Sequence, residues 1–263
     1  MHADTPSTPR PGDTYVQSFA RGLQVIRSFS AQAPQQTLSE VAQRTGLTRA
    51  GARRILLTLE GLGYVRCEGR QFSLAPRILD LGFAYLSSLP LWNLAEPVME
   101  RLVESVKESC SAAVLDGPEI VYVMRVPTHK IMSINLGIGS RLPAHCTSMG
   151  RTLLADLDPG ALDALLGGHP PTRRTDRTIT DPARLRAELA IVREQGWCLV
   201  DQELEEGLVS LSAPIRDRAG RVIAAMNISG QVNRTSPAFM LENFLPRLRA
   251  AAQDISEMLQ RKA

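Results

Sequence analysis

Residues 38–65 of the chain, LSEVAQRTGLTRAGARRILLTLEGLGYV, contain two short amphipathic patterns with a glycine, Gly46, between them. Apolar side chains recur at three- and four-residue spacing in both patterns, which is typical of helices that bury one face. Thr37 and Glu40 have the spacing of a capping box at the start of the first helix. Gly46 suits the left-handed position that ends this helix, and Thr48 is a natural N-cap for the second. The stretch therefore predicts two helices joined by a tight turn.

Arginines crowd the start of the second helix. The predicted inward stripe of this helix is Ala52, Ile55, Leu56, Leu59 and Leu62. Arg49, Arg53 and Arg54 lie off that stripe, as does the small Ala50. A tight turn before the helix leaves its first residues free to enter a major groove, where arginine contacts phosphates or the O6 and N7 atoms of guanine. For any single arginine a solvated helical face is the simpler alternative.

The flanking sequence completes a winged helix-turn-helix. Residues 16–30 carry apolar residues at helical spacing, at Phe19, Leu23, Ile26 and Phe29. Residues 64–74, YVRCEGRQFSL, are typical of two short strands with Gly69 at the turn. We therefore predict a DNA-binding domain over residues 15–76, with double-stranded operator DNA as its partner and a protein-interaction module as the alternative. Its expected DNA-binding residues are Thr48, Arg49, Ala50, Gly51, Arg53, Arg54 and Arg70.

Composition bounds the rest of the chain. The 263 residues allow one large domain or two ordinary ones, and 44% hydrophobic with 22% charged content is that of a soluble globular protein. No apolar run approaches the ~20 residues of a membrane helix, and no signal peptide is recognisable, so we expect no membrane partner. The four cysteines form no CxxC pair, which favours a reducing cytoplasm over a disulfide scaffold. Residues 1–14, with Pro6, Pro9 and Pro11, are predicted to be a disordered tail.

A second domain is expected over residues 94–263, after a linker at residues 77–93. The linker begins with an apolar-rich helix that either packs on the second domain or pairs across a dimer. From there strands and helices alternate, which predicts an α+β protein with a mixed antiparallel sheet. We expect a hairpin over residues 111–126 that turns at 116–118, and further strands at 130–139, 197–201, 209–217 and 220–229. The expected helices are at 94–107, 147–157, 181–196 and 236–262.

Three segments of this second domain are distinctive: LPAHCTSMGRTLLA (142–155), DQELEEGLVSLSAPIRD (201–217) and GRVIAAMNISG (220–230). Together with the winged helix before them, they resemble the IclR family of bacterial transcriptional regulators. The stretch RVPTHKIMSINLGIGSRLPAHCTSMGR (125–151) is similar to the Pca/Pob-type branch, the regulators of β-ketoadipate and aromatic-acid catabolism. The resemblance implies a GAF-like effector domain, a homodimer or dimer of dimers, and a small organic acid as effector. β-Ketoadipate, protocatechuate and 4-hydroxybenzoate are the candidate acids, and regulation of another carbon-catabolic pathway is the alternative.

Effector-binding residues follow partly from local chemistry. Thr147 and Ser148 precede a predicted helix, so their hydroxyls and the amides of Met149 and Gly150 can receive an oxyanion. Plain helix capping explains the same residues equally well. The family resemblance places Ile131, Ile134, Ser210, Asn227 and Ser229 around the same cavity and Asp201 in an acidic ligand loop. Met149 stands where many relatives have a small residue, which implies a tighter pocket. Arg125 and His129 are either neutralising partners for a carboxylate or surface charges.

Catalysis is not expected. Cys146 beside His145 invites comparison with a nucleophile and its base, but sequence neighbours on a strand point apart, and no third member is evident. GxSxG, P-loop and GxGxxG motifs are absent from the sequence. His129, His145 and Cys146 fit no standard zinc spacing. We therefore expect no enzyme, no cofactor and no metal, with a small-molecule hydrolase that uses the Cys146 region as the remote alternative.

Overall fold

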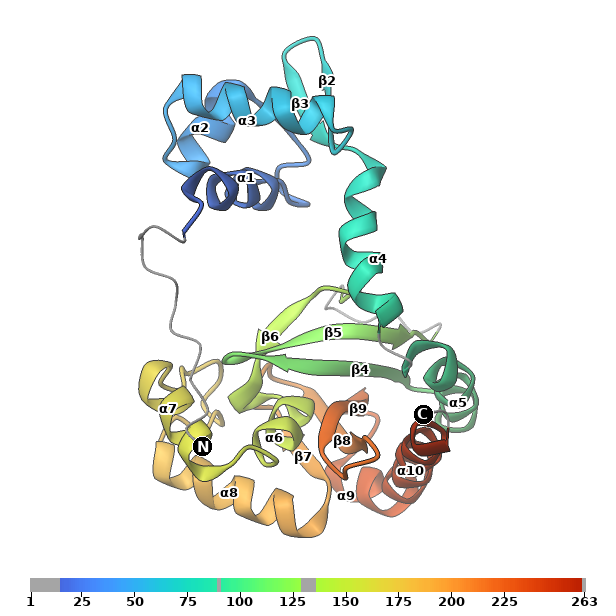
Figure 1. Cartoon of the computed structure of the whole chain (residues 1–263). Helices are drawn as coiled ribbons and strands as arrows, with labels where there is room; N and C mark the ends of the chain where they lie inside the picture. The colour runs from blue at the N-terminus through green and yellow to red at the C-terminus, as the bar shows by residue number, and fades with distance from the viewer. Residues whose placement is uncertain (1–14, 89–90, 129–135, 262–263) are drawn as a thin grey trace. The chain divides into compact units, whose positions relative to one another are not determined.

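The computed structural model describes residues 15–88, 91–128 and 136–261 (Figure 1). By its internal contacts the chain divides into two compact units, Met1–Tyr85 and Leu86–Ala263. The division falls inside the residues expected to form the linker. Among the described residues, no helix is both long and apolar enough to cross a membrane.

The N-terminal unit is a winged helix-turn-helix. Its helices are α1 (Gln17–Ser28), α2 (Leu38–Thr45) and α3 (Arg49–Gly61), and its strands are β1 (Gln35–Thr37), β2 (Val65–Glu68) and β3 (Gln71–Leu74). The strands form an antiparallel sheet in the order β1-β3-β2. Strand β1 was not predicted, because its three residues, Gln-Gln-Thr, show no alternation of apolar and polar residues. The core contains Val25, Phe29, Val41, Ala52, Leu56, Leu59, Val65 and Phe72.

The local signals that predicted this unit are present as hydrogen bonds. The backbone amide of Glu40 donates to Thr37 Oγ1 at 3.3 Å, and the amide of Thr37 donates to the Glu40 carboxylate at 2.7 Å, which confirms the capping box. Gly46 has a φ of 66°, the left-handed conformation that ends α2. Thr48 caps α3 by accepting from the amide of Gly51 at 3.1 Å. These bonds orient the start of α3.

The predicted inward stripe of α3 is wrong at Leu62, and the apolar residues at helical spacing in residues 16–30 are only partly buried. Val25 in α1 and Phe29, directly after it, are buried, whereas Phe19 is 67% exposed and Leu23 is also exposed. Leu62 is exposed as well, since α3 ends at Gly61 and Leu62 lies beyond its last turn. The helical period of these residues was predicted correctly. Fewer of the apolar side chains of α1 are buried against α2 and α3 than the pattern contains.

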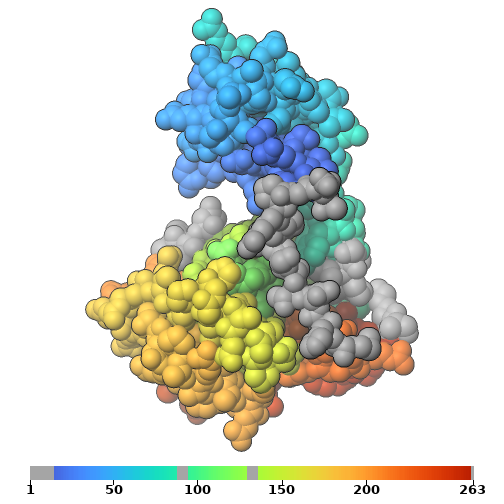
Figure 2. All heavy atoms as spheres, turned by 60° about the vertical axis from the view of Figure 1, so that its left-hand side comes forward, coloured from blue at the N-terminus to red at the C-terminus, as the bar shows by residue number. Residues whose placement is uncertain are grey.

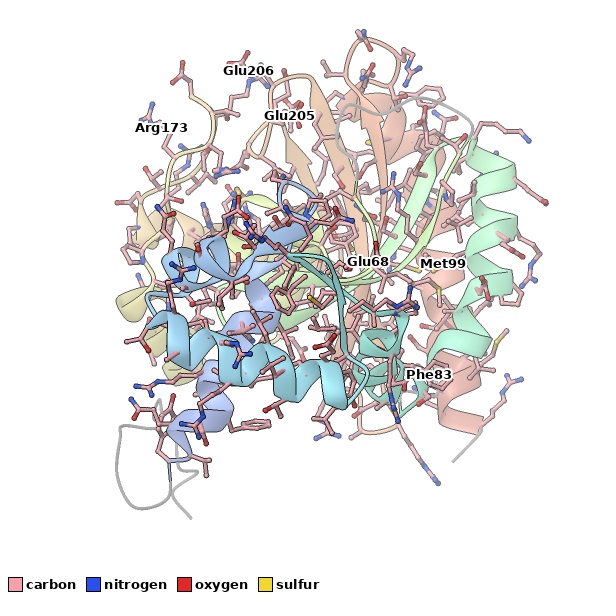
Figure 3. The ribbon with its side chains drawn as sticks, turned by 90° about the horizontal axis from the view of Figure 1, so that it is seen from above. Glu68, Phe83, Met99, Arg173, Glu205 and Glu206 are labelled. Atoms are coloured by element: carbon pink, nitrogen blue, oxygen red, sulfur yellow. The ribbon has the colours of Figure 1, made fainter. Side chains whose placement is uncertain are left out.

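Helix α4 (Leu79–Ser88) follows a short 3₁₀ turn, η1 (Pro76–Ile78). Its large apolar side chains are exposed in the single chain, with Leu79 at 70% and Phe83 at 69%. Leu81 and Tyr85 share this exposure. Phe83 is marked on α4 in Figure 3.

The C-terminal unit is built on one six-stranded antiparallel sheet, in the order β6-β5-β4-β9-β8-β7. The strands are β4 (Ser109–Asp116), β5 (Glu119–Val126), β6 (Arg141–Pro143), β7 (Cys198–Asp201), β8 (Leu208–Arg216) and β9 (Val222–Gln231). The helical elements are α5 (Leu91–Val106), η2 (Ala144–Cys146), α6 (Ser148–Leu154), α7 (Pro159–Gly168), α8 (Pro182–Gln195), α9 (Pro237–Phe239), η3 (Met240–Phe244) and α10 (Leu245–Arg261).

Two apolar cores lie on opposite faces of this sheet. Helices α5 and α10 pack on one face, and α6, α7 and α8 pack on the other (Figure 1). Residues 150–200, which include α7 and α8, are the yellow to orange atoms that form much of the surface of this unit in Figure 2. Neighbouring residues of the central strands point into different cores. Ala112 and Met226 belong to the core with α5 and α10, and Ala113 and Ala225 belong to the core with α6, α7 and α8. The predicted α+β architecture is confirmed.

Three details differ from the sequence-based expectations. Helix α7 was missed, although Asp158 caps it by accepting from the amide of Ala161 and Pro159 occupies its first turn. The predicted strand at 130–139 falls partly on residues 129–135, outside the described residues, and the described residues 136–139 form no strand. The predicted closing helix is interrupted by the π-helical turn η3.

Candidate functional site

The first turns of α3 present an exposed cluster of arginines. Arg49, Arg53 and Arg54 are all exposed, as are Thr48 and Ala50. Throughout the described part of the chain, no hydrogen bond or ion pair engages the three guanidinium groups. Their positive charge is therefore available to an anionic partner outside the chain.

The β2–β3 hairpin adds two more exposed arginines. Arg70 is at the turn, after Gly69 with its φ of 63°, and Arg66 lies on β2. Arg77 differs from both, because its Nη1 donates to the Leu62 carbonyl at 3.1 Å and its guanidinium lies 5.8 Å from the centre of the Tyr64 ring. Arg77 therefore stabilises the base of the hairpin, while Arg66 and Arg70 have no ion pair among the residues described. Arg66 was not among the expected DNA-binding residues.

A cavity lies in the C-terminal unit between the sheet and the start of α6. Its lining residues are Ser109, Ser111, Tyr122, Arg125, Leu136, Cys146, Thr147, Ser148, Met149, Val200, Leu204, Leu208, Ser210, Asn227 and Ser229. Six of the expected effector-binding residues are thus brought together: Thr147, Ser148, Met149, Ser210, Asn227 and Ser229. The cavity volume is about 30 Å³, room for about one or two water molecules.

One side of the cavity is a connected polar network. Ser210 Oγ is its centre, 2.8 Å from Ser148 Oγ and 2.9 Å from Ser229 Oγ. Asn227 Nδ2 donates to Ser210 Oγ at 3.0 Å, and Asn227 Oδ1 accepts from the amide of Ser111 at 3.1 Å. Rotatable hydroxyls can exchange these mutual bonds for bonds to a ligand oxygen, because each carries one donor and two acceptor sites.

Arg125 supplies positive charge to the same wall. It lies on β5, and its Nη1 donates to Ser111 Oγ at 3.4 Å. Ser111 in turn belongs to the network through Asn227. Guanidinium groups bind carboxylates through two parallel N–H bonds. Leu136, Val200 and Leu204 add apolar surface to the lining. A cavity whose lining combines a cation, several hydroxyls and apolar side chains is suited to a small organic anion.

Thr147 has a structural task. It accepts from the amide of Gly150 at 3.2 Å, and its hydroxyl donates to the Pro143 carbonyl at 3.0 Å. Helix α6 has only seven residues, all buried. Helix capping, the alternative raised from the sequence, therefore describes Thr147, while Ser148 contributes its hydroxyl to the network.

The other expected effector-binding residues are not among the lining residues that the structure describes. Asp201, at the end of β7, forms an ion pair with Arg177 and does not line the cavity. Ile131 and Ile134 lie outside the described residues, as does His129.

Strand register explains the polar residues that were not predicted. Ser109 pairs with Ser229, which pairs with Ser210, and one step along, Ser111 pairs with Asn227, which pairs with Ser212. The signal is therefore a polar residue at alternate positions in three strands, Ser109-x-Ser111, Ser210-x-Ser212 and Asn227-x-Ser229. Such alternation places all six side chains on one face of the sheet.

Burial favours the neutral forms of three titratable groups near the cavity, Cys146, Tyr122 and His145. Burial raises the pKa of Cys146 to about 11 and that of Tyr122 to about 12. Burial also lowers the pKa of His145, whose Nε2 lies 2.9 Å from the Thr172 carbonyl. A neutral buried thiol is a poor nucleophile. In the described ranges, no cluster of three His, Cys, Asp or Glu side chains is arranged to hold a metal ion.

Comparison with known proteins assigns both units to described families. Residues 18–69 match the IclR helix-turn-helix domain, and residues 83–257 match the bacterial transcriptional regulator IclR C-terminal domain. The chain is 44% identical to the Pca regulon regulatory protein of Pseudomonas putida, over 93% of this chain and 84% of that protein. It is 33% identical to the p-hydroxybenzoate hydroxylase transcriptional activator of Acinetobacter baylyi, over 94% and 93% of the two chains.

A solved structure is similar over the whole fold. It is an IclR homologue from Microbacterium hydrocarbonoxydans in complex with 4-hydroxybenzoate, with a TM-score of 0.83 and 28% sequence identity. The likeness covers 94% of this chain and all of that one.

Proposed function

The chain belongs to the IclR family of transcriptional regulators, and on that premise we propose that it binds operator DNA under the control of an aromatic acid. The observation that carries the proposal is the cavity whose lining joins Arg125 to the network around Ser210 and adds apolar side chains to both. The relatives support the choice of ligand: one is named as the activator of a p-hydroxybenzoate hydroxylase, and another was solved with 4-hydroxybenzoate. Protocatechuate and the aliphatic diacid β-ketoadipate are the competing candidates.

The operator contact is made by the arginine cluster of α3. Arg49, Arg53 and Arg54 enter the major groove, while Arg70 contacts the backbone from the hairpin tip. The lack of carboxylate partners for these groups among the described residues supports this role, because they lose no internal ion pair on binding phosphate. Thr48, Ala50 and Gly51 complete the contact surface, with small side chains that allow close approach.

Binding occurs as a homodimer or a dimer of dimers. One winged helix buries only about 600–1,000 Å² on DNA, so two copies on a repeated site are needed for a specific interface. The exposed apolar side chains of α4, Leu79, Leu81, Phe83 and Tyr85, supply a surface that a second copy can cover. The operator, and hence the protein, is in the cytoplasm.

The acid is bound with its carboxylate toward Arg125 and its ring toward the apolar side chains of the lining. The carboxylate takes bonds from the guanidinium and from the hydroxyls of Ser148, Ser210 and Ser229. A ring does not fit in about 30 Å³, since drug-sized ligands occupy several hundred Å³. The lining therefore moves when the acid enters, which links occupancy to conformation. No catalytic step is part of this function.

Calorimetric titration with 4-hydroxybenzoate tests the ligand site. The Ser148→Leu variant should lose binding, because the larger side chain fills the cavity and removes one hydroxyl. Ser105→Leu is the matched control, since Ser105 is on α5, outside the cavity lining. Wild-type affinity in the Ser148→Leu protein would show that the site has been placed wrongly.

A further inference from the structure

A buried ion pair joins the start of α6 to the loop between β7 and β8. Arg151 Nη2 is 2.5 Å from Glu203 Oε2, and the two side chains are 3% and 10% exposed. Arg151 Nε donates to the His145 carbonyl at 2.8 Å. Glu203 Oε2 also accepts from the amide of Ile179 at 3.0 Å. The pair therefore ties α6, η2, the β7–β8 loop and the segment before α8 together at one point.

The loop that contains Glu203 supplies a wall of the cavity. Leu204 follows Glu203 directly and lines the cavity, as does Leu208 at the start of β8. Glu205 and Glu206 lie on the same loop and point outward, away from the body of the unit (Figure 3). Glu203 alone among these three glutamates is buried. A carboxylate turned inward beside outward-facing neighbours indicates a specific anchoring role.

The walls that β4, β5, β8, β9 and α6 form are held by bonds other than this ion pair. Strands β4, β5, β8 and β9 are held in the sheet by continuous antiparallel pairing. Helix α6 is joined to β8 by the hydroxyls of Thr152 and Ser212, 2.7 Å apart. The β7–β8 loop begins after β7 and ends before β8, so no ladder holds its centre.

Backbone conformation marks the two ends of this loop. Gln202 has a φ of 62° and Gly207 a φ of 80°, so both are left-handed. Left-handed backbone is unfavourable for a residue with a side chain, and it persists where surrounding contacts enforce it. Here Thr175 Oγ1 donates to the Gln202 carbonyl at 2.7 Å, and Thr178 Oγ1 donates to the Glu203 carbonyl at 2.6 Å. These contacts hold the loop in place at both of its ends.

We propose that Arg151 and Glu203 are positioning residues of the effector site: their ion pair holds the β7–β8 loop closed over the cavity, and the loop opens to admit the acid. The identity of the ligand in this inference rests on the proposed function, whereas the opening of the loop does not depend on it. A cavity with room for about one or two waters must open at some wall. Among the walls that the structure describes, this loop is one whose centre is secured by side-chain bonds and not by a strand ladder. Opening occurs without ligand as a minor local equilibrium.

The rate at which the Cys146 thiol is labelled measures opening of the β7–β8 loop in the absence of ligand. Its buried thiol lines the cavity, while the buried thiols of Cys110 and Cys198 belong to the same unit and do not line it. Methyl methanethiosulfonate converts an accessible thiolate to a methyl disulfide and releases methanesulfinate. Peptide mass spectrometry then gives a separate labelling rate for each cysteine, and labelling at Cys110 and Cys198 identifies global unfolding.

The test variants keep both charges. Glu203→Asp shortens the carboxylate by one methylene, and Arg151→Lys retains the cation but cannot reach His145 and Glu203 together. Each should speed labelling of Cys146 by about tenfold, as expected for an opening equilibrium shifted by about 1.4 kcal/mol, with Cys110 and Cys198 unchanged. Glu119→Asp, in the exposed pair with Arg141, is the matched control and should label as wild type does.

Two results would overturn the proposal. One is an unchanged Cys146 rate in both variants, and the other is a parallel rise at all three buried cysteines, which would mean that the pair only stabilises the fold. Excess 4-hydroxybenzoate should slow Cys146 labelling in the wild type. Failure of the acid to protect Cys146 would contradict the proposed function and leave the variant result for the loop standing.

Discussion

The same four-residue motif begins one helix in each unit, with opposite surroundings. Thr48-Arg-Ala-Gly51 starts α3, and Thr147-Ser-Met-Gly150 starts α6. In both, the threonine hydroxyl accepts from the glycine amide, at 3.1 Å and 3.2 Å. The start of α3 is exposed, whereas every residue of α6 is buried. The local sequence determines the cap, and the surrounding structure decides whether the first turn faces a macromolecule or encloses a small cavity.

The glycines of the two motifs should respond differently to alanine. A Cβ on Gly150 would lie 2.2 Å from the Ala144 carbonyl oxygen and 2.4 Å from Ala144 Cα, so backbone must move. Gly150→Ala should lower the free energy of unfolding by about 3 kcal/mol. In Gly51→Ala the nearest atom is Thr48 Oγ1 at 3.1 Å, and the change should stay within about 1 kcal/mol.

Urea unfolding measures both effects. Trp92 and Trp197 both belong to the C-terminal unit, so their fluorescence follows the unit that contains Gly150. Circular dichroism follows the helices of both units. Equal losses of stability in the two variants would mean that the two caps are not differently enclosed.

The exposed stripe of α4 should account for a comparably large effect, on assembly. Leu81→Glu combined with Phe83→Glu should shift the protein toward monomer in sedimentation, because burial of each such side chain contributes about 1.5–3 kcal/mol. Ile191→Glu, at an exposed apolar position on α8, is the control and should leave assembly unchanged. A doubly substituted protein that remains dimeric would place the subunit contact elsewhere.

The arginines of the exposed motif should affect DNA binding alone. Arg53→Ala or Arg54→Ala should weaken binding to an operator selected from random DNA by about 1–3 kcal/mol if the side chain contacts a base. Arg218→Ala removes an exposed arginine from the C-terminal unit and serves as the control. Gel-shift titration at fixed salt gives the affinities. Wild-type affinity in both variants would reject this face of α3.

His145, beside the buried motif, should give the smallest effect. Burial lowers its pKa in the folded state, so the unfolded chain takes up a proton near its ordinary pKa of about 6.5 while the folded chain does not. The stability that neutral His145 provides is present above that value and is lost as pH falls toward the folded pKa. The urea midpoint should therefore fall less between pH 7.5 and 5.5 in His145→Gln than in the wild type. Equal slopes would contradict this assignment.

The features predicted best from the sequence are those that depend on residues close together in the chain. The capping box at Thr37, the left-handed Gly46 and the cap at Thr48 were predicted because each acts within one turn of helix. The arginines of α3 could be recognised for the same reason, since helical period alone separates them from the inward stripe. The exposure of Phe19 and Leu23 shows the limit: helical period identifies an apolar face but not how much of that face the unit covers.

The cavity depends on residues far apart in the chain. Ser148 meets Ser210 across 62 positions, and Arg151 meets Glu203 across 52. Composition and spacing cannot reveal such pairs, because they follow from strand order and register. Resemblance to the IclR family supplied Ser210, Asn227 and Ser229, yet it left out Ser109, Ser111 and Leu204 and included Asp201, which is paired with Arg177.

The central claim is that an acid bound in the cavity of the C-terminal unit changes the affinity of the winged helix-turn-helix for DNA. The most direct measurement is the operator dissociation constant of the full chain, titrated with 4-hydroxybenzoate, protocatechuate and β-ketoadipate in turn. We predict that at least one acid changes it by a coupling free energy of about 1–3 kcal/mol, and that Ser148→Leu abolishes the change. An operator affinity that no acid alters in the wild type, or that responds equally in Ser148→Leu, would contradict the account.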